Sequence, residues 1–380
     1  MDLDIAGSFE IGPIRPPSEA FSLLLRLTRN CPWNKCRFCH VYKLRKFEIR
    51  AVDEIKHDID TAKHIYDRIN EIAVRQNTDL RQAAGTILNN PPNESYYNVA
   101  LWQYTGGENV FLQDGNSLVM PTAKLVDILS YLKAAFPGIK RITSYARSQT
   151  ASRKTVEELR QLHEAGLSRL HLGLESGYDP LLQLMDKGVT AADHIKGGKN
   201  IVASGISLCE YVLLGLGGKT MWHEHAVATG RVLSEINPDY IRVRTLTILP
   251  EMLLAEDIEN GKFLRSNYED TINEERLLIE NLNCTSYFVS DHSTNLLEEL
   301  NGKLPDDKNN MLSTIDKFLA LGRDDRINFI VGRRTGVYAR LADMDSPGKR
   351  QAADEHVNRI ISANGQFSDE IIWQLMERYI

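Results

Sequence analysis

Between residues 109 and 249 the chain alternates short apolar segments with longer segments whose apolar residues recur at helical spacing. The short segments are typical of buried strands; with an earlier run at 21–28 they are 109–113, 141–146, 169–174, 209–216 and 240–249. The helical segments are 52–73, 121–136, 155–166, 190–205 and 222–236. Six strands separated by helices imply parallel pairing with right-handed crossovers. Both an open doubly wound sheet and a barrel, whole or partial, fit this order.

The pattern is less regular outside that core. Residues 77–100 include "NNPPNESYYN", which is rich in Asn and Pro and predicts a loop or an insertion. Beyond residue 250 we expect one strand and several helices, at 285–290, 272–282, 310–322 and 369–380. The predicted organisation is therefore an N-terminal lead (1–20), an α/β core (21–250) and an appended α+β region (251–380).

Composition narrows the class of protein. The 380 residues are 25% charged and 42% hydrophobic, with a net charge of −6, and no block of Lys or Arg dominates. A reader of nucleic-acid backbones is therefore disfavoured. No apolar run reaches the roughly 18 residues of a membrane span, and the acidic N-terminus lacks an apolar signal core. We expect a cytoplasmic protein with reduced thiols.

Three of the five cysteines lie in the stretch "CPWNKCRFCHVYK" that follows the first predicted strand. Cys31, Cys36 and Cys39 are spaced to hold one compact polynuclear centre. Iron–sulfur clusters usually take four protein thiolates, so three would leave one iron open to a small molecule. Zinc bound by the three cysteines and His40 or a distant histidine is the alternative. The other two cysteines, Cys209 and Cys284, stand alone and are expected to be small core residues.

A three-cysteine loop after the first strand, with an aromatic residue before the third cysteine and alternating strands and helices after it, resembles the radical S-adenosylmethionine (SAM) enzymes. The resemblance covers residues 21–250, with four residues in the first cysteine gap where the family usually has three. It implies a partial (β/α)6 TIM-like barrel with a [4Fe-4S] cluster on Cys31, Cys36 and Cys39. It also implies SAM on the open iron, an electron from ferredoxin or flavodoxin, and a 5′-deoxyadenosyl radical.

The resemblance also places residues around SAM at the C-terminal ends of the strands. Phe38 would shield the site or stack on a planar ligand. Asp114, Gly115 and Asn116 would stand in for the family's Gly-Gly-Glu segment, which meets the amino group of SAM. The literal "GGE" at 106–108 comes before its strand and is the alternative. A tight turn would also explain the Asp-Gly-Asn sequence.

Further residues follow the later strands. Ser144 and Arg147 would meet the carboxylate of SAM, and Glu175, in "LESG", would accept hydrogen bonds from the ribose. The glycine-rich loop 214–219 would pass near adenine. Solvated loops and turns are the alternatives for these segments.

Two residue pairs bear on the substrate. Arg242 and Arg244 alternate along a strand and share a face; if that face points inward, an anionic substrate is expected. Asp291 and His292, past a later strand, are candidates for proton transfer. If Asp291 and His292 are not catalytic, they form an ordinary turn.

The sequence supports three functional hypotheses. The first is a radical SAM oxidoreductase acting on a small anionic metabolite, by analogy with oxygen-independent coproporphyrinogen oxidase. The second is a radical SAM enzyme that modifies RNA or protein, against which the acidic composition argues. The third is a non-enzymatic zinc or iron–sulfur protein that binds a partner through residues 251–380.

Overall fold

The structure is a computed structural model that describes residues 7–377. Its strands form an eight-stranded sheet in the order β1-β4-β5-β6-β7-β8-β9-β10 and a two-stranded sheet, β2-β3. The predicted α/β class and parallel core are thus confirmed. The chain divides into two compact units: unit 1 comprises Met1–Asn34, Val41–Leu172 and Lys196–Leu208, and unit 2 comprises Lys35–His40, Gly173–Ile195 and Cys209–Ile380.

Unit 1 contains the first strands of the large sheet. Its strands are β1 (Leu23–Arg26), β2 (Thr28–Arg29), β3 (Glu48–Ile49), β4 (Asn109–Gln113), β5 (Arg141–Ala146) and the first part of β6 (Leu167–Glu175). β1, β4, β5 and β6 pair in parallel. Nearly every residue of β1 and β4 is buried, which explains why these strands read as continuous apolar runs.

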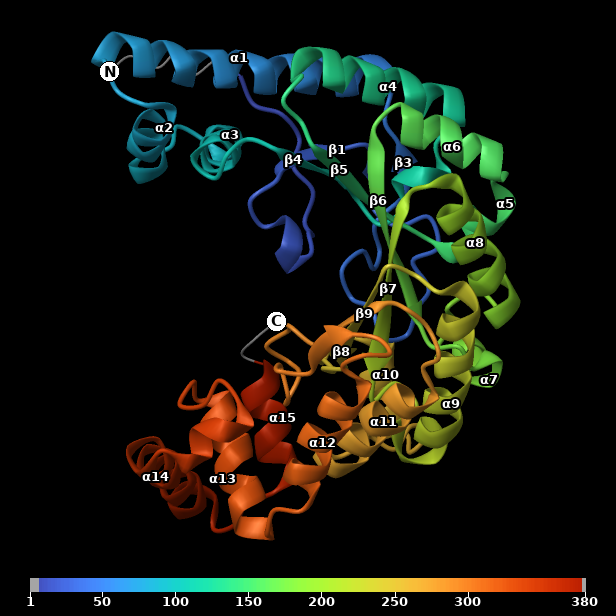
Figure 1. Cartoon of the computed structure of the whole chain (residues 1–380), viewed down its shortest axis with the longest axis vertical. Helices are drawn as coiled ribbons and strands as arrows, with labels where there is room; N and C mark the ends of the chain where they lie inside the picture. The colour runs from blue at the N-terminus through green and yellow to red at the C-terminus, as the bar shows by residue number, and fades with distance from the viewer. Residues whose placement is uncertain (1–6, 378–380) are drawn as a thin grey trace. The chain divides into compact units, whose positions relative to one another are not determined.

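Helices cover one side of these strands. In chain order they are α1 (Val52–Gln76), α2 (Leu80–Asn89), α3 (Glu94–Tyr104), α4 (Thr122–Ala135), α5 (Ser148–Arg153) and α6 (Val156–Glu164). Helices α1, α4 and α6 lie along the same side of β1, β4 and β5, and α4 packs between the other two (Figure 1). At the start of α6, the predicted capping box of Thr155 and Glu158 is confirmed.

The prediction of a loop at 77–100 is wrong, because this segment forms α2 and most of α3. Asn93, within the Asn- and Pro-rich stretch that indicated a loop, is a helix cap, and so is Asp79 before that stretch. The side chain of Asp79 accepts from the Gln82 amide, and that of Asn93 accepts from the Tyr96 amide, as N-cap residues do. The two helices pack against each other and against α1.

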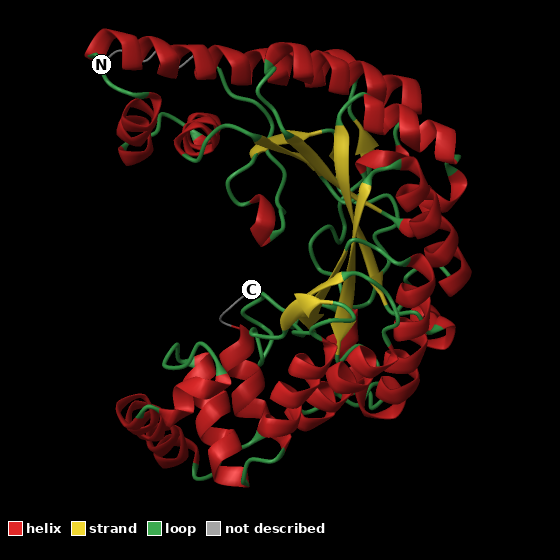
Figure 2. Cartoon of the chain, in the orientation of Figure 1, coloured by secondary structure: helices red, strands yellow, loops and turns green. Residues whose placement is uncertain are grey.

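Unit 2 holds the other half of the sheet and most of the later helices. It contains the end of β6 and the part of β7 (Ser207–Leu214) that begins at Cys209. Its other strands are β8 (Tyr240–Thr245), β9 (Tyr287–Val289) and β10 (Asn301–Lys303). Its helices are α7 (Asp179–Leu184), the start of α8 (Ala191–Ser204), α9 (Gly218–Ile236), α10 (Leu253–Glu259), α11 (Tyr268–Asn281), α12 (Lys308–Leu319), α13 (Arg323–Arg334), α14 (Pro347–Asn364) and α15 (Asp369–Glu377). Helices dominate the part beyond residue 250 (Figure 2).

The region beyond residue 250 is tied into the sheet. β9 pairs in parallel with β8, and β10 pairs antiparallel with β9. Helix α11 packs on α9. Contacts therefore group β7 and β8 with the C-terminal region, whereas the sequence predicted a boundary at residue 250. The last three residues of the predicted helix 369–380 lie outside the described residues.

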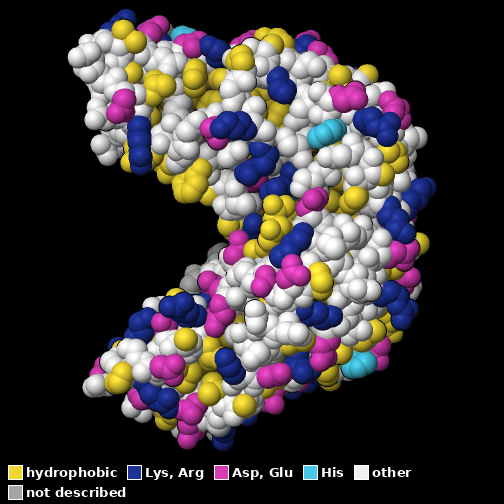
Figure 3. All heavy atoms as spheres, viewed as in Figure 1, with side chains coloured by type: hydrophobic (Ala, Val, Ile, Leu, Met, Phe, Trp, Pro, Cys, Tyr) yellow, Lys and Arg dark blue, Asp and Glu magenta, His cyan; other side chains and the backbone are white. Residues whose placement is uncertain are grey.

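The surface carries charges of both signs. On the face shown in Figure 3, Lys and Arg side chains are interspersed with Asp and Glu. Among residues 7–377, no helix has the length and apolar character that crossing a membrane requires.

Candidate functional site

The cysteine loop begins and ends at a short antiparallel ladder. Thr28 pairs with Ile49 and Arg29 pairs with Glu48, so β2 and β3 hold together the two ends of the intervening loop. Because this ladder continues directly from β1, the loop leaves from the C-terminal end of a parallel strand. That is the end at which barrels of parallel strands place their active sites.

Within unit 1, Asp114 holds the residues on either side of the cysteines: Asn30 before them and Tyr42 after them. Its carboxylate is fully buried. One oxygen accepts from the Nε of Arg26 at 2.7 Å and from the Asn30 amide at 3.0 Å, and the other accepts from the Tyr42 hydroxyl at 3.0 Å. Asn30 directly precedes Cys31, so one carboxylate fixes the chain next to this cysteine.

Ion pairs with Glu10 hold the arginines at the base of the loop. Arg26 also bonds Glu10 at 2.7 Å, and Arg29 reaches the same Glu10 carboxylate at 2.6 Å. The hydrogen bond from Arg29 is the main cause that lowers the pKa of Glu10. The acid therefore stays ionised, and the two arginines at the base of the loop are held in place.

The neighbours of Asp114 make local contacts as well. A Cβ on Gly115 would lie 3.4 Å from the Cβ of Cys31 and 3.4 Å from the Tyr42 ring, so this backbone packs directly on the first cysteine. Asn116 is buried; it donates to Thr150 at 2.8 Å and accepts from the Arg147 amide at 3.3 Å. The role of these three residues at the amino group of SAM stays a prediction.

The two residues predicted after β5 differ in their surroundings. The Ser144 hydroxyl is buried and lies 3.1 Å from the carbonyl oxygens of Leu112 and Tyr145. The guanidinium of Arg147 stands over the ring of Trp33, 5.3 Å from its centroid. Arg147 thus lies beside the first half of the cysteine loop, whereas Ser144 bonds the backbone.

The second half of the loop is a turn within unit 2. The Cys39 amide donates to the Cys36 carbonyl at 3.3 Å, which brings these two cysteines together on one turn. Between them, Arg37 forms a two-pronged pair with Asp257 of α10, one bond of which measures 2.6 Å. The Arg37 amide donates to the Met185 carbonyl at 3.0 Å. This turn is therefore fixed by the arginine between its cysteines.

Phe38 packs with the apolar cluster around this turn. The cluster consists of Leu181, Met185, Leu216, Leu246, Ile248, Met252, Leu254 and Phe263. Lys187 lies over the Phe38 ring, 5.6 Å from its centroid, and bonds Glu175 at 3.1 Å. Glu175 has φ 62 at the end of β6, and a Cβ on Gly173 would lie 2.3 Å from its Oε1. A carboxylate on a residue with left-handed backbone thus meets a lysine that also lies over the aromatic residue before Cys39.

The structure also places the alternative segments. Gly106–Glu108 precede β4, and Glu108 pairs with Lys140 at 2.6 Å on the exposed surface. In the loop 214–219, Gly215 has φ 81 and donates to buried Glu274 at 2.9 Å. Cys209 and Cys284 are both buried.

Arg242 and Arg244 share one face of β8, as predicted, and both reach Asp291. Their distances to its carboxylate are 2.7 Å and 3.3 Å. Arg244 also stands over the Tyr211 ring of β7. Two guanidinium groups therefore share one carboxylate, and the cluster keeps a net positive charge. The Nδ1 of His292 lies 2.7 Å from the Thr294 hydroxyl.

The pKa of His292 is lowered to about 4, because burial disfavours the imidazolium and Arg244 adds to the effect. Between about pH 4 and pH 6.5 the unfolded chain binds a proton here and the folded chain does not. The free energy of unfolding therefore rises with pH across this window. We expect His292→Gln to reduce that rise by about 1–3 kcal/mol, measured by denaturant unfolding at pH 4.5 and pH 7. The same change at exposed His64 should leave the rise intact; an unaltered rise in His292→Gln would contradict the prediction.

Sequence reasoning missed several side chains at this site: Arg26, Arg37, Tyr42, Lys187 and Asp257. Tyr42 gave a signal, since an aromatic side chain in a charged loop indicates burial. The others are charged residues whose partners lie far along the chain, and no spacing points to them. Among residues 7–377, no three His, Cys, Asp or Glu side chains converge to hold a single metal ion.

Comparison with known proteins identifies the central segment. Residues 88–229 match the family model described as "Radical SAM superfamily". An uncharacterized protein of Methanocaldococcus jannaschii is 23% identical over 155 residues, which are 40% of this chain and 47% of that protein. The chain thus spans about half the length of this curated relative. The matched segment begins after the cysteine loop.

The solved structures to which the chain is similar have low sequence identity and low TM-scores. Coproporphyrinogen III oxidase of Escherichia coli, described as a radical SAM enzyme, is 16% identical, with a TM-score of 0.40 over 64% of this chain and 48% of that one. The radical SAM methyltransferase TsrM of Kitasatospora setae, with cobalamin and a [4Fe-4S] cluster bound, is 15% identical, with a TM-score of 0.41 over 62% and 36%.

Proposed function

Since residues 88–229 match the radical SAM family model, we propose that the chain cleaves SAM reductively at a [4Fe-4S] cluster held by Cys31, Cys36 and Cys39. The observation that carries the proposal is the cysteine loop itself. None of its three thiols is in a disulfide, and they lie within the nine residues 31–39, which follow β2. Both halves of the loop are anchored by buried or nearly buried carboxylates, Asp114 and Asp257.

The donor set fits this cluster. Thiolates are the ligands of iron–sulfur clusters, and three of them leave one iron for SAM. The turn that joins Cys36 to Cys39 presents two thiols from adjacent backbone, and Gly115 leaves room for close packing at Cys31. When bound, the cluster supplies the electron that breaks the sulfonium bond of SAM, after delivery by a donor such as ferredoxin or flavodoxin.

The residues of the chain would bind and orient the cluster and SAM. Asp114 and Arg37 set the positions of the cysteines, and Phe38 covers the turn on its apolar side. Glu175 is the candidate for the ribose hydroxyls, because a carboxylate accepts two hydrogen bonds. Arg147 is the candidate for the carboxylate of SAM. Such groups pre-position a reactant and exclude water from it.

A small anionic substrate is supported by the face of β8. Arg242 and Arg244 share only Asp291, and the Nη2 of Arg244 is buried without a hydrogen-bond partner among the described residues. A buried guanidinium nitrogen without a partner favours the binding of an anion that accepts its hydrogen bonds. His292, with a pKa of about 4, would be neutral near pH 7 but a weak base, so the proton-transfer role of Asp291 and His292 stays a prediction.

The proposal is tested by anaerobic reconstitution with iron and sulfide, followed by reduction in the presence of SAM. We expect a brown protein with about four irons per chain and the formation of 5′-deoxyadenosine. A colourless, zinc-binding protein that leaves SAM intact would contradict it and would favour the non-enzymatic hypothesis. Reconstituted protein without reductant serves as the control, because the sulfonium bond should then stay unbroken.

A further inference from the structure

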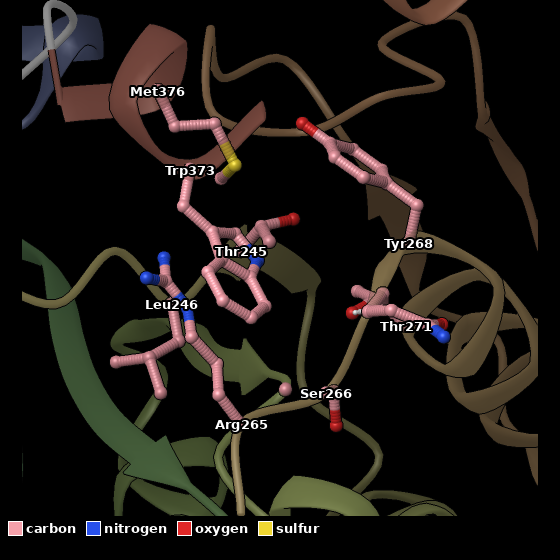
Figure 4. A pocket seen from close by; sticks show the side chains of 10 residues that line it. Thr245, Leu246, Arg265, Ser266, Tyr268, Thr271, Trp373 and Met376 are labelled. Carbon is pink, nitrogen blue, oxygen red and sulfur yellow. Dashed lines mark hydrogen bonds between the residues drawn. The ribbon is translucent and has the colours of Figure 1, made fainter. Parts of the chain in front are cut away.

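A small pocket lies at the C-terminal ends of β7 and β8 within unit 2. Its walls come from those strand ends, from the segment before and inside α11, and from α15 (Figure 4). They comprise Gly215, Thr245, Leu246, Arg265, Ser266, Asn267, Tyr268, Thr271, Trp373 and Met376. The free volume is about 20 Å³, and the pocket is partly open to solvent. Leu246 belongs both to this wall and to the apolar cluster that contacts Phe38.

Arg265 is the only cation in this wall, and it makes no ion pair with any acid among residues 7–377. Its guanidinium stacks on the indole of Trp373, 4.2 Å from the ring centroid (Figure 4). Its Nη2 is buried and has no hydrogen-bond partner in the described part of the chain. Burial lowers the pKa of Arg265 to about 10, whereas Glu377 and Tyr268 act in the opposite direction.

A half-buried guanidinium without a counterion is unusual. Buried charges are normally paired, because removing them from water is costly. Stacking on an aromatic ring offsets about 0.5–2 kcal/mol of that cost, and it leaves the N–H donors unused. The N–H groups of Arg265 are therefore hydrogen-bond donors without an acceptor among the described residues.

The polar groups around Arg265 do not supply that acceptor. Glu274 accepts from the Gly215 amide and lies 3.3 Å from the Nε2 of His225. The Tyr268 hydroxyl accepts from the Nε of Arg334 at 2.9 Å. A second guanidinium thus lies on the far side of Tyr268, and the pocket is positive on two sides.

We propose that this pocket binds a small carboxylate, whose two oxygens pair with the guanidinium of Arg265 against the face of Trp373. A planar guanidinium matches a carboxylate in two parallel hydrogen bonds. The flat group suits the small free volume better than a tetrahedral phosphate does. The inference goes beyond the proposed function and does not depend on radical chemistry. The carboxylate could be free in solution or be that of Glu377 on α15.

The test uses the full chain and sodium acetate as the probe, with sodium chloride at equal ionic strength as the reference. We expect acetate to raise the midpoint of thermal unfolding of the wild type by about 2 °C more than it raises that of Arg265→Met. Because Arg265→Met removes an unpaired buried charge and retains an apolar stem, its own midpoint without acetate should equal or exceed that of the wild type. Arg359→Met, at an exposed arginine of α14, should respond to acetate as the wild type does.

Each other outcome overturns part of the inference. If Arg265→Met melts several degrees lower and acetate acts equally on both proteins, Arg265 is a structural contact for α15 and the site is refuted. If sodium phosphate stabilises the wild type more than acetate does, the carboxylate assignment is wrong. If Glu377→Gln creates the response to acetate and the wild type shows none, the internal carboxylate is the occupant and a free ligand is excluded. As a second readout, acetate should change the tryptophan fluorescence of the wild type and leave that of Trp373→Phe unchanged.

Discussion

Cys36→Ala is expected to lose the iron of the reconstituted protein and to lower the yield of 5′-deoxyadenosine more than about 100-fold. Changing a residue that only supports a ligand costs about 10–100-fold in metal affinity, and Cys36 is proposed as a direct ligand. It is the most buried of the three cysteines, and the Arg37 pair fixes the turn on which it stands. Iron analysis and product chromatography after reduction with SAM measure both effects.

The matched control is Cys284→Ala, which removes another buried thiol and should retain iron and turnover. Two outcomes are informative. Full iron and turnover in Cys36→Ala would refute the ligand assignment. Loss of both in Cys284→Ala would show that the assay reports a general loss of folding.

Asp114→Asn should reduce iron incorporation by about 10-fold or more while the chain still folds. The amide cannot match the two ionised oxygens that accept from Arg26, Asn30 and Tyr42. Breaking a buried charge pair costs about 3–5 kcal/mol of stability. The ion pair between Glu10 and Arg26 remains and offsets part of this cost. We expect the iodoacetamide reaction of Cys31 in metal-free protein to accelerate relative to that of Cys39, as read by mass spectrometry.

Tyr42→Phe removes one bond of the same carboxylate and should shift both readouts in the same direction by less. Asp316→Asn, at an exposed acid that pairs with Arg276, is the control and should change neither. If Asp114→Asn instead raised the KM for SAM at full iron content and unchanged Cys31 reactivity, the carboxylate would act on SAM, as the sequence predicted.

The strands of the core could be predicted because burial on both faces produces uninterrupted apolar runs. Helices such as α6 were equally clear, since a capping box marks the first turn. Helices α2 and α3 were not, because Asp79 and Asn93 serve as caps in this context and as turn formers in others. Helix α14 buries only Ala353, so it lacks the apolar stripe by which a helix is recognised.

The site shows a similar division. The cysteine spacing is local and therefore visible, and so is the Glu175 segment at the end of β6. The contacts of Asp114 join residues 72 to 88 positions apart, and the Arg37–Asp257 pair spans 220 positions. Only the folded sheet brings such groups together, so a single sequence does not reveal that these acids hold the loop.

The short strands β9 and β10 have a practical consequence for anyone who shortens this protein. β9 occupies the free backbone of β8, and β10 is only three residues long and ends in Lys303. A fragment that stopped near residue 250 would present a bare strand of amides and carbonyls, which is a template for aggregation between copies. A shortened chain that retains β1 to β8 should accordingly extend past residue 303.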